Sequence, residues 1–137
     1  MGELGELFGQ LIIACYIFAM LNFVFKFINR YFGNKLKKYP KLYTYYLKLM
    51  KFFVKNHRYF GMAAIVFIFI HAYIQYNNYG VSITGFIAAI IMLLQIGFGM
   101  YAYHKKKNNK LWINLHKGLA FVLLFAIIIH VSWFFKI

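Results

Sequence analysis

Four long apolar stretches alternate with polar or basic segments along the chain. Each stretch is long enough for an α-helix to cross the hydrocarbon core of a bilayer, which is about 30 Å thick and takes about 20 residues. The hydropathy pattern predicts membrane spans at residues 4–29, 56–76, 81–104 and 111–135. We therefore expect an all-α fold, an integral membrane four-helix bundle that forms a single transmembrane domain over residues 1–137.

Between the first and second spans, residues 41–55 show a different periodicity. Apolar side chains recur there at intervals of three and four residues, and lysines repeat every seven residues on the opposite side. This pattern predicts an amphipathic helix, begun after Pro40, that lies at the membrane interface. Because neither glycine nor proline separates this segment from the second span, it could also be an extension of the spanning helix.

The composition supports a membrane protein and changes how its charge is interpreted. Of the 137 residues, 64% are hydrophobic, and 16 basic residues stand against only two acidic ones, for a formal net charge of +14. A soluble domain of this size cannot bury so much apolar surface. High positive charge can indicate nucleic-acid binding, but the basic residues fill the gaps between apolar stretches, where an anionic membrane surface attracts them. We expect membrane lipid, and not nucleic acid, as a partner.

The distribution of lysine and arginine predicts an orientation. Residues 26–58 carry ten basic residues and residues 105–117 carry five, whereas the N-terminal segment and the predicted turn at 77–80 carry none. Cytoplasmic loops are enriched in basic residues. In a multi-pass protein of the cell membrane, the two basic segments should therefore lie in the cytoplasm and both termini outside. The second and fourth spans should then run in the same direction.

The second and fourth spans each contain a pair of histidines 14 residues apart, His57 with His71 and His116 with His130. Fourteen residues is two heptads, so each pair falls on one helix face, and its members stand about 21 Å apart along the axis. With the predicted orientation, His57 and His116 lie at the cytoplasmic end, and His71 and His130 lie nearer the outer side. Ionisable residues are rare within membrane spans and indicate a function there.

Two helices that run side by side can hold one haem iron between a histidine of each, and such ligation suits the iron to electron transfer. We therefore expect two b-type haems, an inner one ligated by His57 and His116 and an outer one ligated by His71 and His130. A zinc or copper site needs its ligands close to one another. A proton relay usually adds carboxylates within the membrane, and none lies near the histidines in the sequence.

Other residues near the histidines are candidates for holding the haem. Gly61 lies one helical turn beyond His57 and would let the porphyrin approach the backbone, although small residues in membrane helices also serve helix packing. Arg58 and Lys117 could bind the haem propionates, or they could be ordinary cytoplasmic anchors of their helices. His104, at the inner end of the third span, is expected to lie in the interface region beside the lysines.

Three segments resemble the transmembrane core of ferric reductase-like and cytochrome b561-like proteins: HRYFG at 57–61 leading to His71, the dipeptide Thr84–Gly85, and LWINLHKG at 111–118 leading to His130. The resemblance covers residues 56–135. In that superfamily, paired histidines on two helices hold two b haems across the membrane. The resemblance implies the same ligand role for the four histidines in the second and fourth spans.

The chain departs from that superfamily in ways that bear on its function. Ferric reductases usually have six spans and an attached flavin and nicotinamide domain, whereas this sequence has four expected spans and no GxGxxG motif. The resemblance therefore implies that electrons come from a partner, a flavoprotein or a quinol. The small size and lysine-rich loops also resemble small haem-binding membrane proteins of bacterial haem-responsive operons, which are associated with haem capture and with protection from haem or oxidants.

The expected function is that of a bis-histidine di-haem b cytochrome, which carries electrons across the membrane from a cytoplasmic or quinol donor to an outer acceptor. The acceptor would be ferric iron, a quinone or an oxygen species, and an enzymatic activity would be that of an oxidoreductase acting with a partner. No catalytic residue is assigned. The alternative is a protein that sequesters or detoxifies haem, or protects from oxidants, without a dedicated redox partner. A third is a structural or regulatory subunit without a cofactor.

Overall fold

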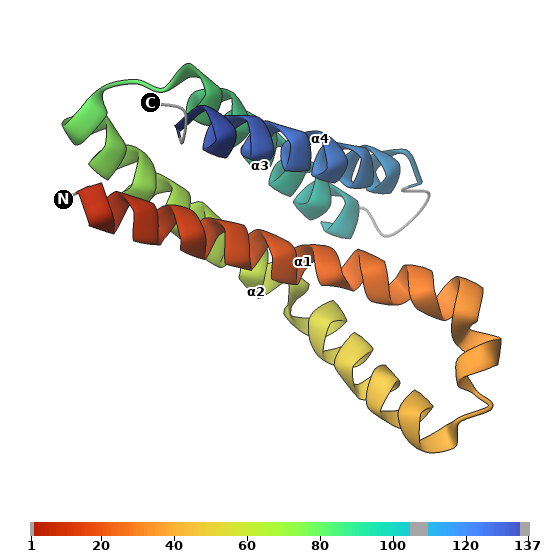
Figure 1. The fold of residues 1–137 in the computed structure, drawn as a ribbon. Helices are drawn as coiled ribbons and strands as arrows, with labels where there is room; N and C mark the ends of the chain where they lie inside the picture. Colours follow the sequence, from red (N-terminus) through yellow and green to blue (C-terminus); the bar gives the residue numbers. More distant parts are fainter. Residues whose placement is uncertain (1, 105–109, 135–137) are drawn as a thin grey trace. The chain divides into compact units, whose positions relative to one another are not determined.

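The computed structural model describes residues 2–104 and 110–134, and over these residues the chain forms four helices (Figure 1). The helices are α1 (Gly2–Leu36), α2 (Pro40–Tyr79), α3 (Ile83–His104) and α4 (Lys110–Phe134). Each is long and apolar enough to cross a membrane, which confirms the all-α prediction with four candidate spans. Residues 105–109 of the predicted basic turn at 105–110, and residue 135 at the end of the predicted fourth span, lie outside the described residues.

Helices α1 and α2 continue well beyond the spans that hydropathy predicts. α1 ends at Leu36 rather than at residue 29, and α2 begins at Pro40 and runs for 40 residues. The separate amphipathic helix expected at 41–55 is therefore the first part of α2. Proline suits the first position of a helix because its φ is already helical, and no glycine follows before Gly61. At the helical rise, α2 is about 60 Å long, twice the thickness of a bilayer core.

The connection between α2 and α3 is shorter than the polar segment that the sequence predicts as a turn. The side-chain amides of Asn77 and Asn78 donate to backbone carbonyls four residues earlier, at 3.0 and 2.9 Å, within the helix. Gly80 ends α2 with a φ of 79°, and its N–H still donates to the carbonyl four residues earlier. Ser82 then caps α3, because its Oγ accepts the N–H of Gly85 at 3.3 Å.

The chain divides into two helical hairpins, and each is described by itself. The first hairpin, Glu3–His71, packs α1 against most of α2 through aromatic rings. Ring centroids lie 5.9, 5.3 and 5.2 Å apart in three pairs: Phe8 with Phe67, Phe18 with Phe60, and Phe25 with Phe53. In these pairs the residue number increases along α1 while that of its partner decreases along α2. The two helices are therefore antiparallel.

The second hairpin contains α3 and α4 with the last turns of α2. Trp112 of α4 packs on Phe98 and Tyr101 of α3, with ring centroids 5.5 and 4.7 Å apart. The hydrophobic side chains that are buried in α3 and α4 are Ala88, Met92, Ala120 and Leu123. Two of the four are alanines, and such small residues let helix backbones approach closely.

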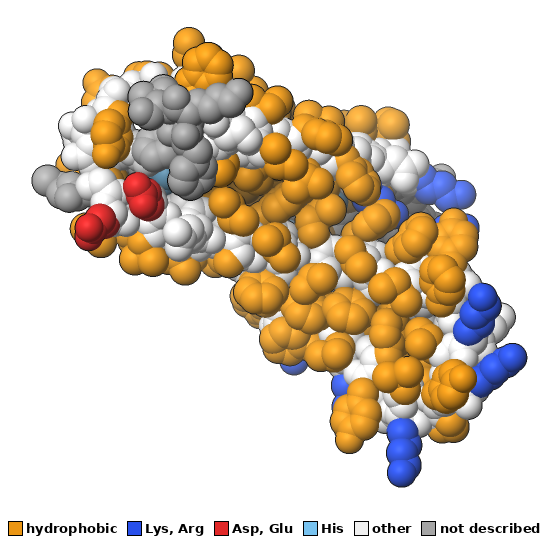
Figure 2. Space-filling model, viewed as in Figure 1, with side chains coloured by type: hydrophobic (Ala, Val, Ile, Leu, Met, Phe, Trp, Pro, Cys, Tyr) orange, Lys and Arg blue, Asp and Glu red, His pale blue; other side chains and the backbone are white. Residues whose placement is uncertain are grey.

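The exposed surface of the described helices is largely apolar. Figure 2 shows hydrophobic side chains over much of the visible face of each hairpin, with several lysines and arginines near the turn between α1 and α2. Soluble monomers rarely expose apolar patches of such extent. The surface, like the helix lengths, is consistent with a multi-pass membrane protein.

Candidate functional site

In the first hairpin, both histidines of α2 are half-buried and bond to the backbone of α1. Nδ1 of His57 lies 3.0 Å from the carbonyl oxygen of Ala19, and Nδ1 of His71 lies 2.8 Å from that of Gly5. Gly5 and Ala19 are 14 residues apart, the same interval that separates the two histidines. Because two helices have the same rise per residue, equal intervals on both keep each histidine level with its acceptor. The same histidine–carbonyl contact therefore occurs twice along α1.

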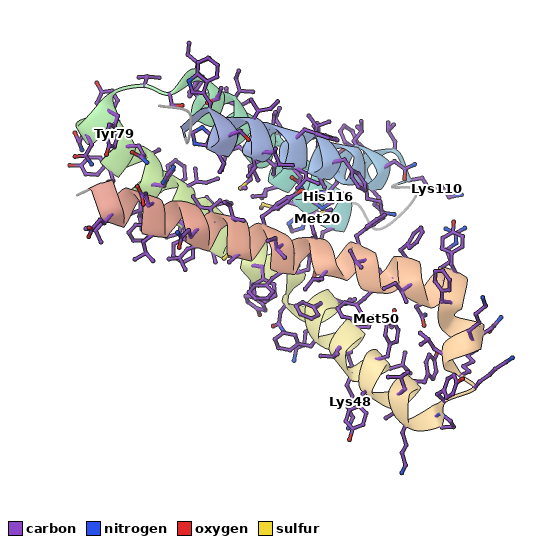
Figure 3. The ribbon with its side chains drawn as sticks, in the orientation of Figure 1. Met20, Lys48, Met50, Tyr79, Lys110 and His116 are labelled. Atoms are coloured by element: carbon purple, nitrogen blue, oxygen red, sulfur yellow. The ribbon has the colours of Figure 1, made fainter. Side chains whose placement is uncertain are left out.

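The second hairpin repeats this arrangement between α4 and α3; His116 is labelled in Figure 3. Nδ1 of His116 lies 2.7 Å from the carbonyl oxygen of Gln95, and Nδ1 of His130 lies 3.0 Å from the hydroxyl oxygen of Thr84. Since His130 is two heptads beyond His116, the equivalent carbonyl would lie 14 residues before Gln95, at Val81. That residue precedes the first turn of α3, and the Thr84 hydroxyl takes its place.

Glycines of α1 and α3 lie in close contact with three of the four imidazole rings. A Cβ atom added to them would lie 2.9 to 3.3 Å from a ring atom: Gly9 against His71, Gly85 against His130, and Gly99 against His116. The cause is helical geometry, because a carbonyl that accepts from an imidazole also accepts the N–H four residues on. A ring that bonds to the carbonyl of Gln95 therefore packs on Gly99, where a larger side chain would push it away.

The residue midway between the two histidines of a helix shows which face carries them. Ala64 in α2 and Leu123 in α4 each lie seven residues from both histidines of their helix, and they are 3% and 1% exposed. The histidines and the midway residue are thus on the face that packs against the preceding helix of the same hairpin. Each imidazole is held between two helices.

These contacts determine which ring nitrogen can act as a ligand. A backbone carbonyl only accepts hydrogen bonds, so in the three histidines that contact one, Nδ1 carries the proton and the lone pair of the neutral ring is on Nε2. His130 has the same tautomer when its Nδ1 donates to Thr84, whose hydroxyl can donate in turn to Ser82 Oγ at 3.2 Å. Metal-ligating histidines have this arrangement, with one nitrogen fixed by an outer partner and the other directed to the metal.

The other residues predicted near the histidines have exposed or open positions. At Gly61, no neighbouring group of the described structure reaches within 4 Å of the place where a Cβ would lie. Arg58 and Lys117 are exposed, each one residue after a histidine of its helix. His104 is the last residue of α3 and is exposed, with its ring edge-on to that of Tyr103 at 5.5 Å between centroids.

The structure brings each histidine together with the preceding helix of its own hairpin. The predicted inner and outer pairs join residues of different hairpins, and they stay a prediction. Among residues 2–104 and 110–134, no group of three or more His, Cys, Asp or Glu side chains is placed to hold a metal ion. Bis-histidine haem ligation uses only two protein ligands for each iron.

The residues of α1 and α3 that position the imidazoles are hard to predict from residue type. Gly5 and Ala19, for example, contribute a backbone carbonyl, which every residue has. The glycines are a detectable signal, because Gly85 and Gly99 have the same 14-residue spacing as the histidines. In the first hairpin this signal is incomplete, since the residue one turn after Ala19 is Phe23 and not a glycine.

Comparisons of the chain with protein-family models, with curated proteins and with solved structures find no match. The assignment of a function therefore depends on the geometry of the chain itself. Four imidazoles, spaced alike in two hairpins and each bonded through Nδ1 to the neighbouring helix, form the candidate functional site.

Proposed function

We propose that this chain is a membrane cytochrome that binds two b-type haems and carries electrons between the two faces of the membrane. In this proposal His57 and His116 ligate an inner haem, and His71 and His130 ligate an outer one. The observation that carries it is the anchored Nδ1 of all four imidazoles, at 2.7 to 3.0 Å from an oxygen on the neighbouring helix. Haem ligation through Nε2 needs that tautomer and a ring held in one orientation.

The residues around the imidazoles fit a haem ligand better than a purely structural histidine. A histidine that only bonds two membrane helices together can be replaced by other polar side chains, whereas all four positions here hold histidine, three of them with a glycine against the ring. Glycine costs about 0.5–1 kcal/mol relative to alanine inside a helix, yet Gly9, Gly85 and Gly99 each occupy such a position. Their presence is explained if each ring must lie close to the neighbouring helix with Nε2 in a defined direction.

A haem with two histidine ligands supplies one-electron transfer when bound, because both axial positions of the iron are filled. The chain supplies the positioning. Hydrogen bonds from Nδ1 orient each ring and raise the basicity of its other nitrogen. Arg58 and Lys117, exposed next to His57 and His116 in the sequence, would bind propionate carboxylates. The open side of Gly61 leaves room for the macrocycle near α2.

The proposed cytochrome has a defined orientation in the membrane and exchanges electrons with a donor and an acceptor. The ten basic residues at 26–58 favour a cytoplasmic position for the turn between α1 and α2, with both termini outside. The first part of α2, residues 41–55, would extend from the spanning part on the cytoplasmic side, with its lysines toward water. A flavoprotein or a quinol is the donor, and ferric iron, a quinone or an oxygen species is the acceptor, in line with the resemblance to ferric reductase-like proteins.

Pyridine haemochrome analysis of the purified protein tests the proposal. We expect two b-type haems per chain. His71→Ala and His57→Ala should each remove one haem and leave the other, because these residues belong to different sites. His104→Ala is the matched control, since this exposed histidine should leave the haem content unchanged. Protein without haem after growth in haem-supplemented medium, or with both haems in every histidine variant, contradicts the proposal.

A second measurement separates electron transfer from haem storage. Ferricyanide enclosed in vesicles whose membrane contains the protein should be reduced when a membrane-impermeant reductant is added outside. His130→Ala should abolish this transfer, because it interrupts the path at the outer haem. If the haems bind but no electrons cross the membrane, the haem-sequestering alternative describes the protein better.

A further inference from the structure

A groove between α1 and α2 lies outside the histidine sites, toward the turn that joins these helices. It has a volume of about 530 Å³. Four of its side chains are polar, three of them cationic: Lys26, Arg30 and Lys51 with the amide of Asn29. We call this feature the basic groove. All of its residues belong to the first hairpin, so its two walls are placed within one unit of the structure.

The chain offers few anions to balance the charges of the basic groove. Its only acidic residues are Glu3 and Glu6, at the start of α1. The helix from Glu6 to Lys26 is about 30 Å long, and Figure 2 shows the acidic side chains and the turn between α1 and α2 at opposite ends of the first hairpin. An anion that neutralises the groove therefore has to come from outside this part of the chain.

Asn29 adds an uncharged polar side chain to the lining of the groove. Its Oδ1 atom is buried and has no hydrogen-bond partner among the described residues. This oxygen lies next to Gly33 of the same helix, 3.3 Å from the place where a Cβ of that residue would lie. The NH₂ group of the same amide can donate to an anionic oxygen.

The groove also has an apolar wall. Leu47, Met50 and Val54 line it from α2, where Met50 lies on the side of the helix toward α1 and Lys48 on the far side (Figure 3). Exposed rings such as that of Phe52 occur along the same part of α2. A ligand with a charged head and an apolar tail fits these surroundings. A soluble acidic protein fits them less well, because it would leave much of the apolar surface in water.

We propose that the basic groove binds the phosphate group of an anionic phospholipid. Arg30 offers a planar guanidinium from α1, and Lys51 offers an ammonium from α2, so one phosphate would connect the two helices. The acyl chain would follow the apolar wall. The lipid would thereby stabilise the parts of α1 and α2 that extend beyond the hydrocarbon core. This site is separate from haem binding and does not depend on it.

Native mass spectrometry of the full chain in detergent tests this site, with phosphatidylglycerol as the probe and phosphatidylcholine as the zwitterionic comparison. Lys51→Gln and Arg30→Gln should each weaken phosphatidylglycerol binding by about tenfold, since each removes a charge-assisted hydrogen bond. Lys48→Gln is the matched control. It removes the same charge from the same helix but does not line the groove, and its ammonium lies over the Tyr45 ring, 5.7 Å from the centroid. It should change the affinity by less than about twofold.

A further variant keeps the test decisive if Arg30→Gln does not fold. Asn29→Asp is nearly isosteric and places a negative charge in the groove, so it should also weaken phosphatidylglycerol binding. Circular dichroism of each variant should match that of the original protein. If Asn29→Asp and Lys51→Gln both fold and both bind phosphatidylglycerol with unchanged affinity, the proposal is wrong.

Three other results would overturn the proposal. If Lys48→Gln weakens binding as much as Lys51→Gln, the lipid is held by diffuse surface charge. If inorganic phosphate competes as well as the lipid does, the groove is a site for free phosphate and the apolar wall plays no part. If haem-free protein binds phosphatidylglycerol and haem-loaded protein does not, the groove holds haem propionates instead.

Discussion

The Nδ1 atom of His130 lies 3.0 Å from the Oγ1 atom of Thr84, and of the four Nδ1 contacts of the anchored histidines this is the one made to a side chain. The other three bond to backbone carbonyls, which substitution leaves in place. Thr84 Oγ1 is also 3.2 Å from Ser82 Oγ, which accepts the N–H of Gly85. The first turn of α3 is therefore connected through two hydroxyls to one imidazole.

Removing the Thr84 hydroxyl should change the reduction potential of the proposed outer haem. Thr84→Val keeps the shape of the side chain but removes the acceptor of the Nδ1–H bond, which makes the imidazole a weaker donor to ferric iron. A hydrogen bond contributes about 0.5–1.5 kcal/mol, so the potential should rise by about 20–60 mV for a one-electron couple.

Redox titration of the purified protein measures this shift, which should affect one haem only. Thr84→Ser is the control, because its hydroxyl can accept the same bond and should keep the original potential. An unchanged potential in Thr84→Val would contradict the tautomer assigned to His130.

Two glycines of α3 provide a matched pair of substitutions. A Cβ at Gly99 would lie 3.0 Å from Cε1 and from Nδ1 of His116, whereas at Gly97 no described group lies within 4 Å. Gly99→Ala should therefore displace the His116 ring and loosen the inner haem. Gly97→Ala should keep both haems and stabilise the helix by about 0.5–1 kcal/mol. Visible spectra before and after dialysis measure haem retention, and equal retention in the two variants would argue against ligation by His116.

The packing of α4 against α3 depends on Leu123, which is 1% exposed. Leu123→Ala should lower the free energy of unfolding by about 2–3 kcal/mol, because the side chains around the cavity that it leaves lose van der Waals contacts. The neighbouring Val122 is 50% exposed, so Val122→Ala should change that free energy by less than about 0.5 kcal/mol. Titration with sodium dodecyl sulfate, followed by circular dichroism, compares the two variants. A larger effect at Val122 would contradict the burial of Leu123.

Cysteine labelling from one side of the membrane tests the proposed orientation. Cys15 is the only cysteine and would first be replaced by alanine. A membrane-impermeant maleimide added to intact cells should then label Val81→Cys, between α2 and α3, but not Lys38→Cys, between α1 and α2. Both positions are exposed. The reverse pattern would invert the orientation, and labelling of both positions would show that α2 does not span the bilayer.

Most of the secondary structure follows from hydropathy, and the differences lie at helix ends. Four spans are apparent because apolar stretches of bilayer length are typical of membrane helices. Hydropathy does not report where a helix ends in water, since lysine and arginine are good helix formers, and α1 therefore continues to Leu36. Asn77 and Asn78 resemble a turn by residue type, but their amides bond to the preceding turn of the helix.

The spacing of the histidines is sufficient to place each pair on one helix face, because 14 residues return a side chain to the same side of a helix. Apolar length is likewise sufficient to predict four membrane-length helices. What holds the imidazoles depends on how the helices pack, because the acceptors are three backbone carbonyls and one hydroxyl from a neighbouring helix. A carbonyl is common to every residue type, and a glycine becomes informative only when packing brings it to a ring, as with Gly99 and His116.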